Sequence, residues 1–156
     1  MRRFQVYCPC WTPELIAVWE DAGFLCQAEL PAEGEETPDV IFLPPGQPAI
    51  PWRLADTHRP KLFLLADGAR TPLPAELADR YNLQYIQGET LCFSVATRLE
   101  GCLELPEWEI YRTESRLSDT DQIKAVAVAS YYYLLYDIMR ETFEWCGHTF
   151  SVLGPA

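Results

Sequence analysis

Apolar residues in the first half of the chain fall into short runs separated by turn residues, a pattern typical of alternating strands and helices. The predicted strands comprise residues 3–7, 24–30, 40–43, 61–65 and 83–86. Between the first two strands, Thr12 is a good N-cap, Pro13 suits the first helical position and Gly23 is a typical stop, so a helix is predicted there. The run at 40–43 is apolar throughout, as in a strand buried on both faces of a parallel sheet. The pattern predicts an α/β fold with a five-stranded, doubly wound parallel sheet.

The connections between the later strands are short. Four prolines between positions 44 and 51 exclude a long helix after the third strand. Further helices are predicted at 73–80 and at 90–99. We therefore expect one α/β domain with abbreviated crossovers over residues 1–104.

A long helix dominates the rest of the chain, residues 105–156, which we expect to form a helical extension packed on the sheet. It is predicted from Ser118 or Asp119 to Cys146, with Gly147 as its stop. Its apolar residues form two stripes. One consists of Val128, Tyr132, Leu135, Met139, Phe143 and Cys146, and the other of Ile123, Ala127, Tyr131, Leu134, Ile138 and Trp145. A helix that is apolar on two sides has to cover both.

The stripe that does not face the sheet is either buried within the same chain or meets a partner. A second copy is the expected partner, because two-fold pairing is the commonest association of identical chains. We expect a homodimer with contacts at Tyr131, Leu134, Ile138 and Trp145. If this stripe is covered within the chain, the contact surface lies elsewhere.

The charge balance narrows the choice of partners. Lys and Arg number 12 against 23 Asp and Glu, a formal net charge of −11 that repels nucleic-acid phosphates, so we expect no direct DNA or RNA binding. Acidic residues are concentrated in 29–39 and in 100–121. Such runs are usually solvated faces, but they also suit docking on a basic protein surface. One alternative function is therefore an acidic decoy or inhibitor of a basic nucleic-acid-binding protein.

The sequence indicates a cytoplasmic protein without a membrane segment. The longest apolar stretch, 125–136, falls short of the ~20 residues needed to cross a bilayer. The first residues are too short and too interrupted for the apolar region of a signal peptide. The six scattered cysteines are expected to be free thiols.

No metal, cofactor or catalytic residue is predicted. Cys8-x-Cys10 and Cys146-x-His148 offer four soft ligands for zinc, but their spacing is not that of zinc knuckles and the pairs lie at opposite ends of the chain. A nucleophilic Cys146 with His148 as its base lacks an identifiable oxyanion donor. Packing of the thiols in the interior is the favoured interpretation.

Loops after the strands suggest a second alternative function. Gly46 and the Asp67-Gly68 pair lie where doubly wound folds bind ligands, but no glycine-rich phosphate loop accompanies them. An enzyme or sensor with a small-molecule pocket at the carboxyl ends of the strands is therefore kept as an alternative. Asp119 and Asp121 coincide with a helix start, where carboxylates favourably oppose the helix dipole.

Over residues 3–101 the order of strands and turns resembles a response-regulator receiver domain, a flavodoxin-like fold. The Pro38-Asp39 pair leading into the apolar run 40–43 is similar to the third strand of that family. Where the resemblance places the acidic Mg²⁺ pair, the phosphoacceptor aspartate, the hydroxyl residue and the lysine of a receiver, this chain has Cys8 and Pro9, Pro44, Leu65 and Gln87. Phosphoryl transfer needs metal-binding oxygens, a nucleophilic oxygen and a cation. The resemblance therefore implies a degenerate receiver, a pseudo-receiver without phosphoacceptor chemistry.

These observations together predict a non-catalytic regulatory or adaptor protein that acts by protein–protein contact. The sheet would be its platform and the aromatic C-terminal helix its contact element. A fold resemblance alone does not establish a signalling role.

Overall fold

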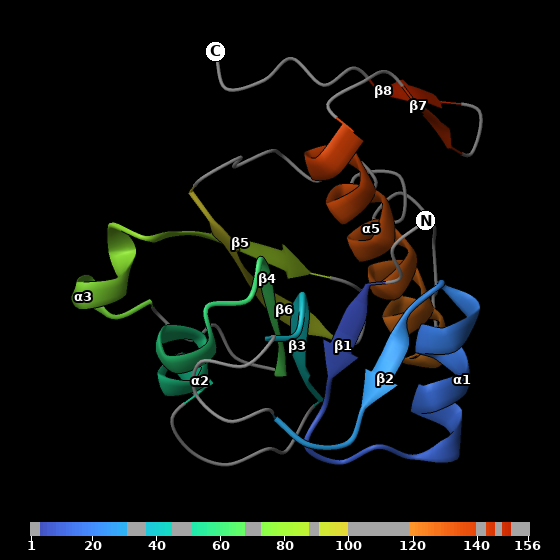
Figure 1. Cartoon of the computed structure of the whole chain (residues 1–156), viewed down its shortest axis with the longest axis horizontal. Coiled ribbons are helices and arrows are strands. Elements are labelled where there is room, and N and C mark those ends of the chain that lie inside the picture. Colours follow the sequence, from blue (N-terminus) through green and yellow to red (C-terminus); the bar gives the residue numbers. More distant parts are fainter. Residues whose placement is uncertain are drawn as a thin grey trace.

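The computed structural model describes residues 4–30, 37–44, 51–67, 73–87, 91–99, 119–139, 143–145 and 148–150. The helices are α1 (Pro13–Asp21), α2 (Pro51–His58), α3 (Ala75–Ala78) and α5 (Asp119–Met139). The strands are β1 (Gln5–Tyr7), β2 (Leu25–Gln27), β3 (Val40–Leu43), β4 (Leu62–Asp67), β5 (Tyr81–Gln87), β6 (Cys92–Arg98), β7 (Phe143–Trp145) and β8 (His148–Phe150). Strands β1 to β6 form one sheet, and β7 and β8 form a separate two-stranded sheet (Figure 1).

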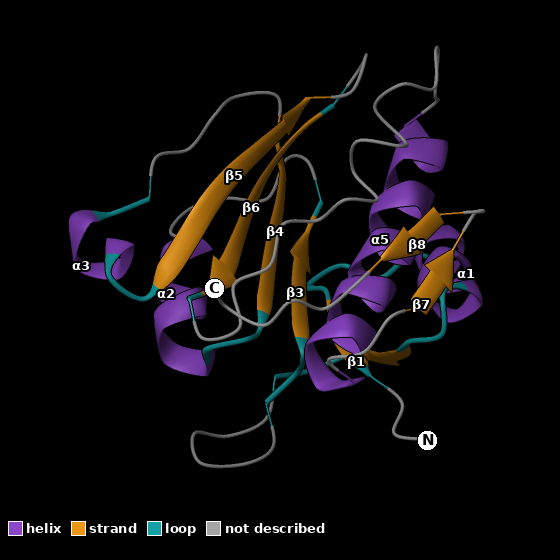
Figure 2. Ribbon diagram, turned by 90° about the horizontal axis from the view of Figure 1, so that it is seen from above, coloured by secondary structure: helices purple, strands orange, loops and turns teal. Residues whose placement is uncertain are grey.

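The main sheet is mixed, with strand order β2-β1-β3-β4-β6-β5. Strands β2, β1, β3 and β4 are parallel, whereas β6 runs antiparallel to both of its neighbours. Figure 2 shows β6 pointing against β4 and β5 on either side of it. The α/β class and the five predicted strands are confirmed. The sheet nevertheless has six strands and is not parallel throughout.

Strand β6 replaces a helix that was wrongly predicted at 90–99. Its residues Phe93 and Val95 belong to the core on one face of the sheet, and Ala96 belongs to the core on the other. Aromatic and β-branched residues at these positions favour a strand once neighbouring strands are available on both sides. The pairing with β4 and β5 therefore decided the conformation of a short apolar run that is ambiguous by itself.

Helices cover both faces of the sheet (Figure 1). Helices α1 and α5 lie on one face, and α2 and α3 on the other. Strand β3 contributes side chains to the core on both faces of the sheet. Val40 and Phe42 face α1 and α5, whereas Ile41 and Leu43 face α2. All four side chains are buried, as expected from a run that is apolar throughout.

Helix α1 begins and ends as its sequence predicts. The backbone N–H of Leu15 donates to Oγ1 of Thr12 over 3.1 Å, and Pro13 occupies the first turn. Gly23 follows the helix with φ of +108°, a conformation that only glycine adopts readily. A Cβ at Gly23 would lie 2.8 Å from Cε2 of Tyr131 on α5, so the glycine also permits close packing of the two helices.

Helix α5 ends at Met139, earlier than predicted. Residues 143–145 and 148–150 form the antiparallel pair β7 and β8, with Trp145 opposite His148. The predicted continuation of the helix to Cys146 is therefore wrong. Aromatic residues on both sides of Gly147 favour a hairpin over a helix end. In the part of the chain that the structure describes, no helix is both long and apolar enough to cross a bilayer.

Candidate functional site

The carboxyl ends of β1 and β3 form the edge at which doubly wound sheets usually hold ligands. The two strands are adjacent and parallel, and the helices that follow them lie on opposite faces of the sheet. Cys8 follows β1 and Pro44 follows β3, and both are buried. Pro9 lies beside Cys8 and is exposed. Three of the five degenerate receiver positions therefore gather at this edge.

Leu65 lies next to this edge, because it pairs with Leu43, the residue before Pro44, in the β3–β4 register. Its side chain is buried in the core under α2. The fifth receiver position is not brought to the same place. Gln87 ends β5, which is separated from β4 by β6 and lies at the border of the sheet. The inserted strand thus prevents β5 from taking the position beside β4 that the receiver resemblance implies.

Burial of thiols is the main electrostatic feature of this edge. Burial raises the pKa of Cys8 to about 12, with Cys10 and Cys26 as neighbouring groups. Burial, together with the Glu20 carboxylate, raises the pKa of Cys26 to about 11. Both thiols are protonated at neutral pH and are poor nucleophiles and metal ligands in that form. The four described cysteines form no disulfide.

The described residues bear on only part of the zinc and acidic-pair hypotheses. No three of the described histidine, cysteine, aspartate and glutamate residues lie together in a group that suits a metal ion. Cys146 and the side chain of His148 lie outside the described part of the chain. Asp119 begins α5, in keeping with its predicted place at a helix start.

The described part of the predicted dimer stripe is largely covered within the chain. Leu134 is fully buried, and Ile123 and Ala127 belong to the same core. Tyr131 is half-buried, and its ring lies edge-on to Phe4 at a centroid distance of 5.5 Å. The side chains of Ile138 and Trp145 lie outside the described residues.

A second candidate site lies at the opposite edge of the sheet and was missed by the sequence analysis. A cavity of about 290 Å³ opens there. Its lining residues are Arg59, Asp79, Arg80, Tyr81, Arg98 and Leu99. They come from the end of α2, the turn before β5, the start of β5 and the end of β6.

Hydrogen bonds tie these elements together. The carbonyl oxygen of Ala55 on α2 accepts from the backbone N–H of Arg59 over 2.8 Å and from the hydroxyl of Tyr81 over 3.1 Å. An ion pair joins Arg80 to Asp56 on α2. The backbone N–H of Leu99 donates to the carbonyl oxygen of Arg80 over 3.0 Å. These hydrogen bonds and the ion pair join the end of α2 to the β5–β6 pair, and both elements line the cavity.

Three guanidinium groups act on the Tyr81 hydroxyl. Burial raises the pKa of Tyr81, and the positive charges of Arg98, Arg59 and Arg80 oppose that rise. Arg98 pairs directly with Tyr81 in the β5–β6 register. No sequence signal brings the three arginines together, because they are about twenty positions apart and belong to no local motif.

Basic residues are concentrated at this edge. Six lysines and arginines have described side chains. Four of them, Arg59, Lys61, Arg80 and Arg98, lie just after α2 or at the adjoining strand ends, whereas Arg53 lies in the first turn of α2 and Lys124 lies on α5. A local excess of positive charge is notable in a chain whose formal net charge is −11.

Comparisons of the chain with protein-family models, curated proteins and solved structures returned no match. The receiver resemblance therefore stays a prediction.

Proposed function

We propose that this protein is a non-catalytic regulatory or adaptor domain that acts by contact with another protein. The observation that carries the proposal is the composition of the β1–β3 edge. Cys8 and Pro44 occupy, in buried form, the positions after the two strands. A protonated thiol and a proline ring supply neither the metal-binding oxygens nor the nucleophilic oxygen that phosphoryl transfer needs.

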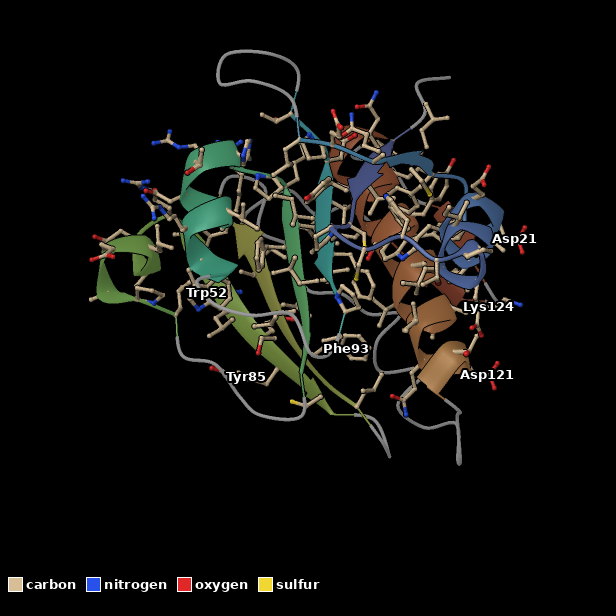
Figure 3. All side chains as sticks on the ribbon, turned by 90° about the horizontal axis from the view of Figure 1, so that it is seen from below. Asp21, Trp52, Tyr85, Phe93, Asp121 and Lys124 are labelled. Carbon is tan, nitrogen blue, oxygen red and sulfur yellow. The ribbon has the colours of Figure 1, made fainter. Side chains whose placement is uncertain are left out.

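The outer surface of α1 and α5 is the contact surface that we favour. Glu14, Glu20 and Asp21 on α1 and Asp121 on α5 are exposed. Figure 3 shows Asp21 and Asp121 on the same side of the molecule, remote from Trp52 on α2. Lys124 on α5 is also exposed on this side, so the surface carries these four acidic side chains against one basic side chain. A net negative surface steers association with an oppositely charged one and contributes more to specificity than to affinity. The expected partner therefore presents a basic surface.

A hydrogen bond joins the two helices that form this surface. The Thr120 hydroxyl on α5 donates to Oε1 of Glu14 on α1 over 2.9 Å. Asp39, by contrast, belongs to the acidic run 29–39 but is buried, and its carboxylate accepts from the backbone N–H of Gln5 over 2.9 Å. Asp39 is therefore part of the fold and is not available for docking.

Affinity capture with charge-reversed baits tests the proposal. The wild-type protein should retain a protein partner from its host, and Asp21→Lys should release it because the substitution reverses one charge on the α1–α5 surface. Glu76→Lys is the matched control, since Glu76 is also exposed but lies on α3 at the other face of the sheet. Equal retention by all three baits, or no specific partner, would contradict the proposed surface.

A second experiment tests the absence of phosphoacceptor chemistry. Incubation with acetyl phosphate and Mg²⁺ should leave the intact mass unchanged. A stoichiometric phosphoryl adduct would overturn the pseudo-receiver interpretation.

Adding nucleic acid to the captured complex distinguishes the acidic decoy from the adaptor. Nucleic acid should displace the partner only if this protein occupies the partner's nucleic-acid-binding surface, as a decoy would.

A further inference from the structure

We propose that the cavity between the end of α2 and the β5–β6 pair binds a small organic phosphate ester. This inference is independent of the proposed adaptor function, since the cavity lies at the opposite edge from Cys8 and Pro44. It rests on the charge of the lining, on its shape and on the backbone of one arginine.

The charge of the lining favours an anion. Arg59, Arg80 and Arg98 contribute three guanidinium groups, against one carboxylate from Asp79. Each guanidinium has five N–H donors, so the ion pair of Arg80 with Asp56 leaves donors for a ligand. The cavity is therefore rich in positively charged hydrogen-bond donors.

The number of arginines favours a phosphoryl group over a carboxylate. One guanidinium fork satisfies the two oxygens of a carboxylate, whereas the three terminal oxygens of a phosphate monoester accept from several forks arranged around them. Here the forks come from three different parts of the chain, namely the end of α2, the turn before β5 and the end of β6. Guanidinium groups from three separate segments suit the three terminal oxygens of a tetrahedral group better than the two of a planar one.

The cavity also has room and apolar contacts for a carbon skeleton. Its volume of about 290 Å³ is near the lower end of the range for small-molecule sites. Leu99 at its rim is 45% exposed and is one of two large apolar side chains in the described residues that are exposed. The Tyr81 hydroxyl donates to the Ala55 carbonyl, so Tyr81 offers the cavity its ring and not a donor. These features favour an ester over free phosphate.

The backbone of Arg59 supports a role for its side chain. Arg59 has φ of +45° and is the one non-glycine residue with positive φ in the described part of the chain. Glycine is favoured at this position after a helix, and an arginine there carries backbone strain. A cation is favourable after the C-terminus of any helix, and this general effect accounts for Arg59 alone. It does not account for Arg80 and Arg98, which reach the same cavity from other elements.

The direct test is a calorimetric titration of the wild-type protein with glycerol 3-phosphate. We expect saturable binding that is tighter than binding of inorganic phosphate or acetate at equal ionic strength. Inorganic phosphate binding equally well would overturn the assignment to an ester. No saturable binding of glycerol 3-phosphate at millimolar concentration would overturn the site itself.

Substitutions in the lining should change affinity in both directions. Arg98→Ala should weaken binding about tenfold or more, because it removes a charged donor. Asp79→Asn should tighten binding severalfold, because it removes a like charge from the cavity. Arg53→Ala is the matched control, since Arg53 is exposed on α2 but does not line the cavity. Equal losses in Arg98→Ala and Arg53→Ala would indicate general charge attraction and contradict the proposal.

Arg59→Gly separates binding from folding. Glycine suits the positive φ at this position, so the melting temperature should be unchanged or higher while affinity falls about tenfold. A variant that melts normally and binds glycerol 3-phosphate as the wild type does would exclude Arg59 from the site. A fall in melting temperature together with unchanged binding would likewise contradict its assigned role.

Discussion

The two halves of the sheet differ in direction, in exposure and in what their ends hold. In the parallel half, β2-β1-β3-β4, the carboxyl ends of β1 and β3 meet at an edge occupied by the buried residues Cys8 and Pro44. In the antiparallel half, β6 is buried along its interior, whereas the described side chains of β5 after Tyr81 are half-buried at the sheet border. The residues that follow the parallel strands β1 and β3 are therefore buried, whereas the border strand β5 is only partly covered.

The reversal of β6 explains the difference at the two edges. Because β6 runs against β5, its last residue, Arg98, lies beside the first residue of β5, Tyr81. Because it also runs against β4, the same end of β6 lies at the start of β4. The end of α2 meets the same edge through the hydrogen bond from Tyr81 to Ala55. A helix at 90–99 would not have placed Arg98 there. The arginine-lined cavity is thus a consequence of one antiparallel strand in an otherwise parallel arrangement.

Truncating one side chain in each half of the sheet should give the largest difference in the free energy of unfolding. Phe42→Ala in β3 removes a ring that is fully buried and lies 5.3 Å from the Trp19 ring, so the free energy of unfolding should fall by about 3–5 kcal/mol. Tyr85→Ala on the half-buried edge strand β5 should cost about 1–2 kcal/mol. Urea unfolding measures both. Equal losses would show that the edge strand is as important for stability as the parallel core.

The next largest loss in the free energy of unfolding is expected from a substitution in helix α5. Leu134 has no exposed surface, so Leu134→Ala should lower the free energy of unfolding by about 2–5 kcal/mol. The loss should not depend on protein concentration, because the contacts lie within one chain. Tyr132→Ala, at a half-buried position on the same helix, should cost less.

Sedimentation of the wild-type protein tests the predicted homodimer separately. A dimer that dissociates in Leu134→Ala without unfolding would contradict the placement of Leu134 in the core of the chain.

High pH should weaken the thiol-containing edge of the parallel half. In the unfolded chain the thiol of Cys8 ionises near its ordinary pKa of 9.0, whereas in the folded chain its pKa is about 12. The unfolded state is therefore stabilised as the pH rises above 9, and the free energy of unfolding should fall between pH 9 and pH 12. Urea midpoints in reducing buffer should fall less steeply with pH in Cys8→Ala. Identical slopes would contradict the burial of this thiol.

The smallest expected effect concerns β6 itself. The hydroxyl of Ser94 is buried and has no hydrogen-bond partner among the described residues, so Ser94→Ala should leave the free energy of unfolding unchanged or raise it by up to about 1 kcal/mol. Ser130→Ala is the matched control, because the buried Ser130 hydroxyl donates to the Val126 carbonyl over 2.7 Å and its loss should destabilise by about 1 kcal/mol. A similar destabilisation in both variants would reveal a partner for Ser94.

Local sequence signals predict the structure correctly where they agree with the fold. The cap at Thr12 and the stop at Gly23 bound α1, and the apolar run at 40–43 forms a strand buried on both faces. The predictions are wrong at 90–99 and at the end of α5, where short apolar and aromatic segments suit a helix or a strand equally well. In both places, pairing with another strand decided between them.

The sequence by itself determined the α/β class, five of the strands, the first helix and the residues that follow β1 and β3. These features depend on caps, turns and periodicity over a few neighbouring positions. Tertiary structure alone decided the direction of β6, the burial of Leu134 within the chain and the meeting of Arg59, Arg80 and Arg98. The physical reason is that strand pairing and helix packing join segments far apart along the chain, so no local pattern specifies which of the available surfaces will cover each segment.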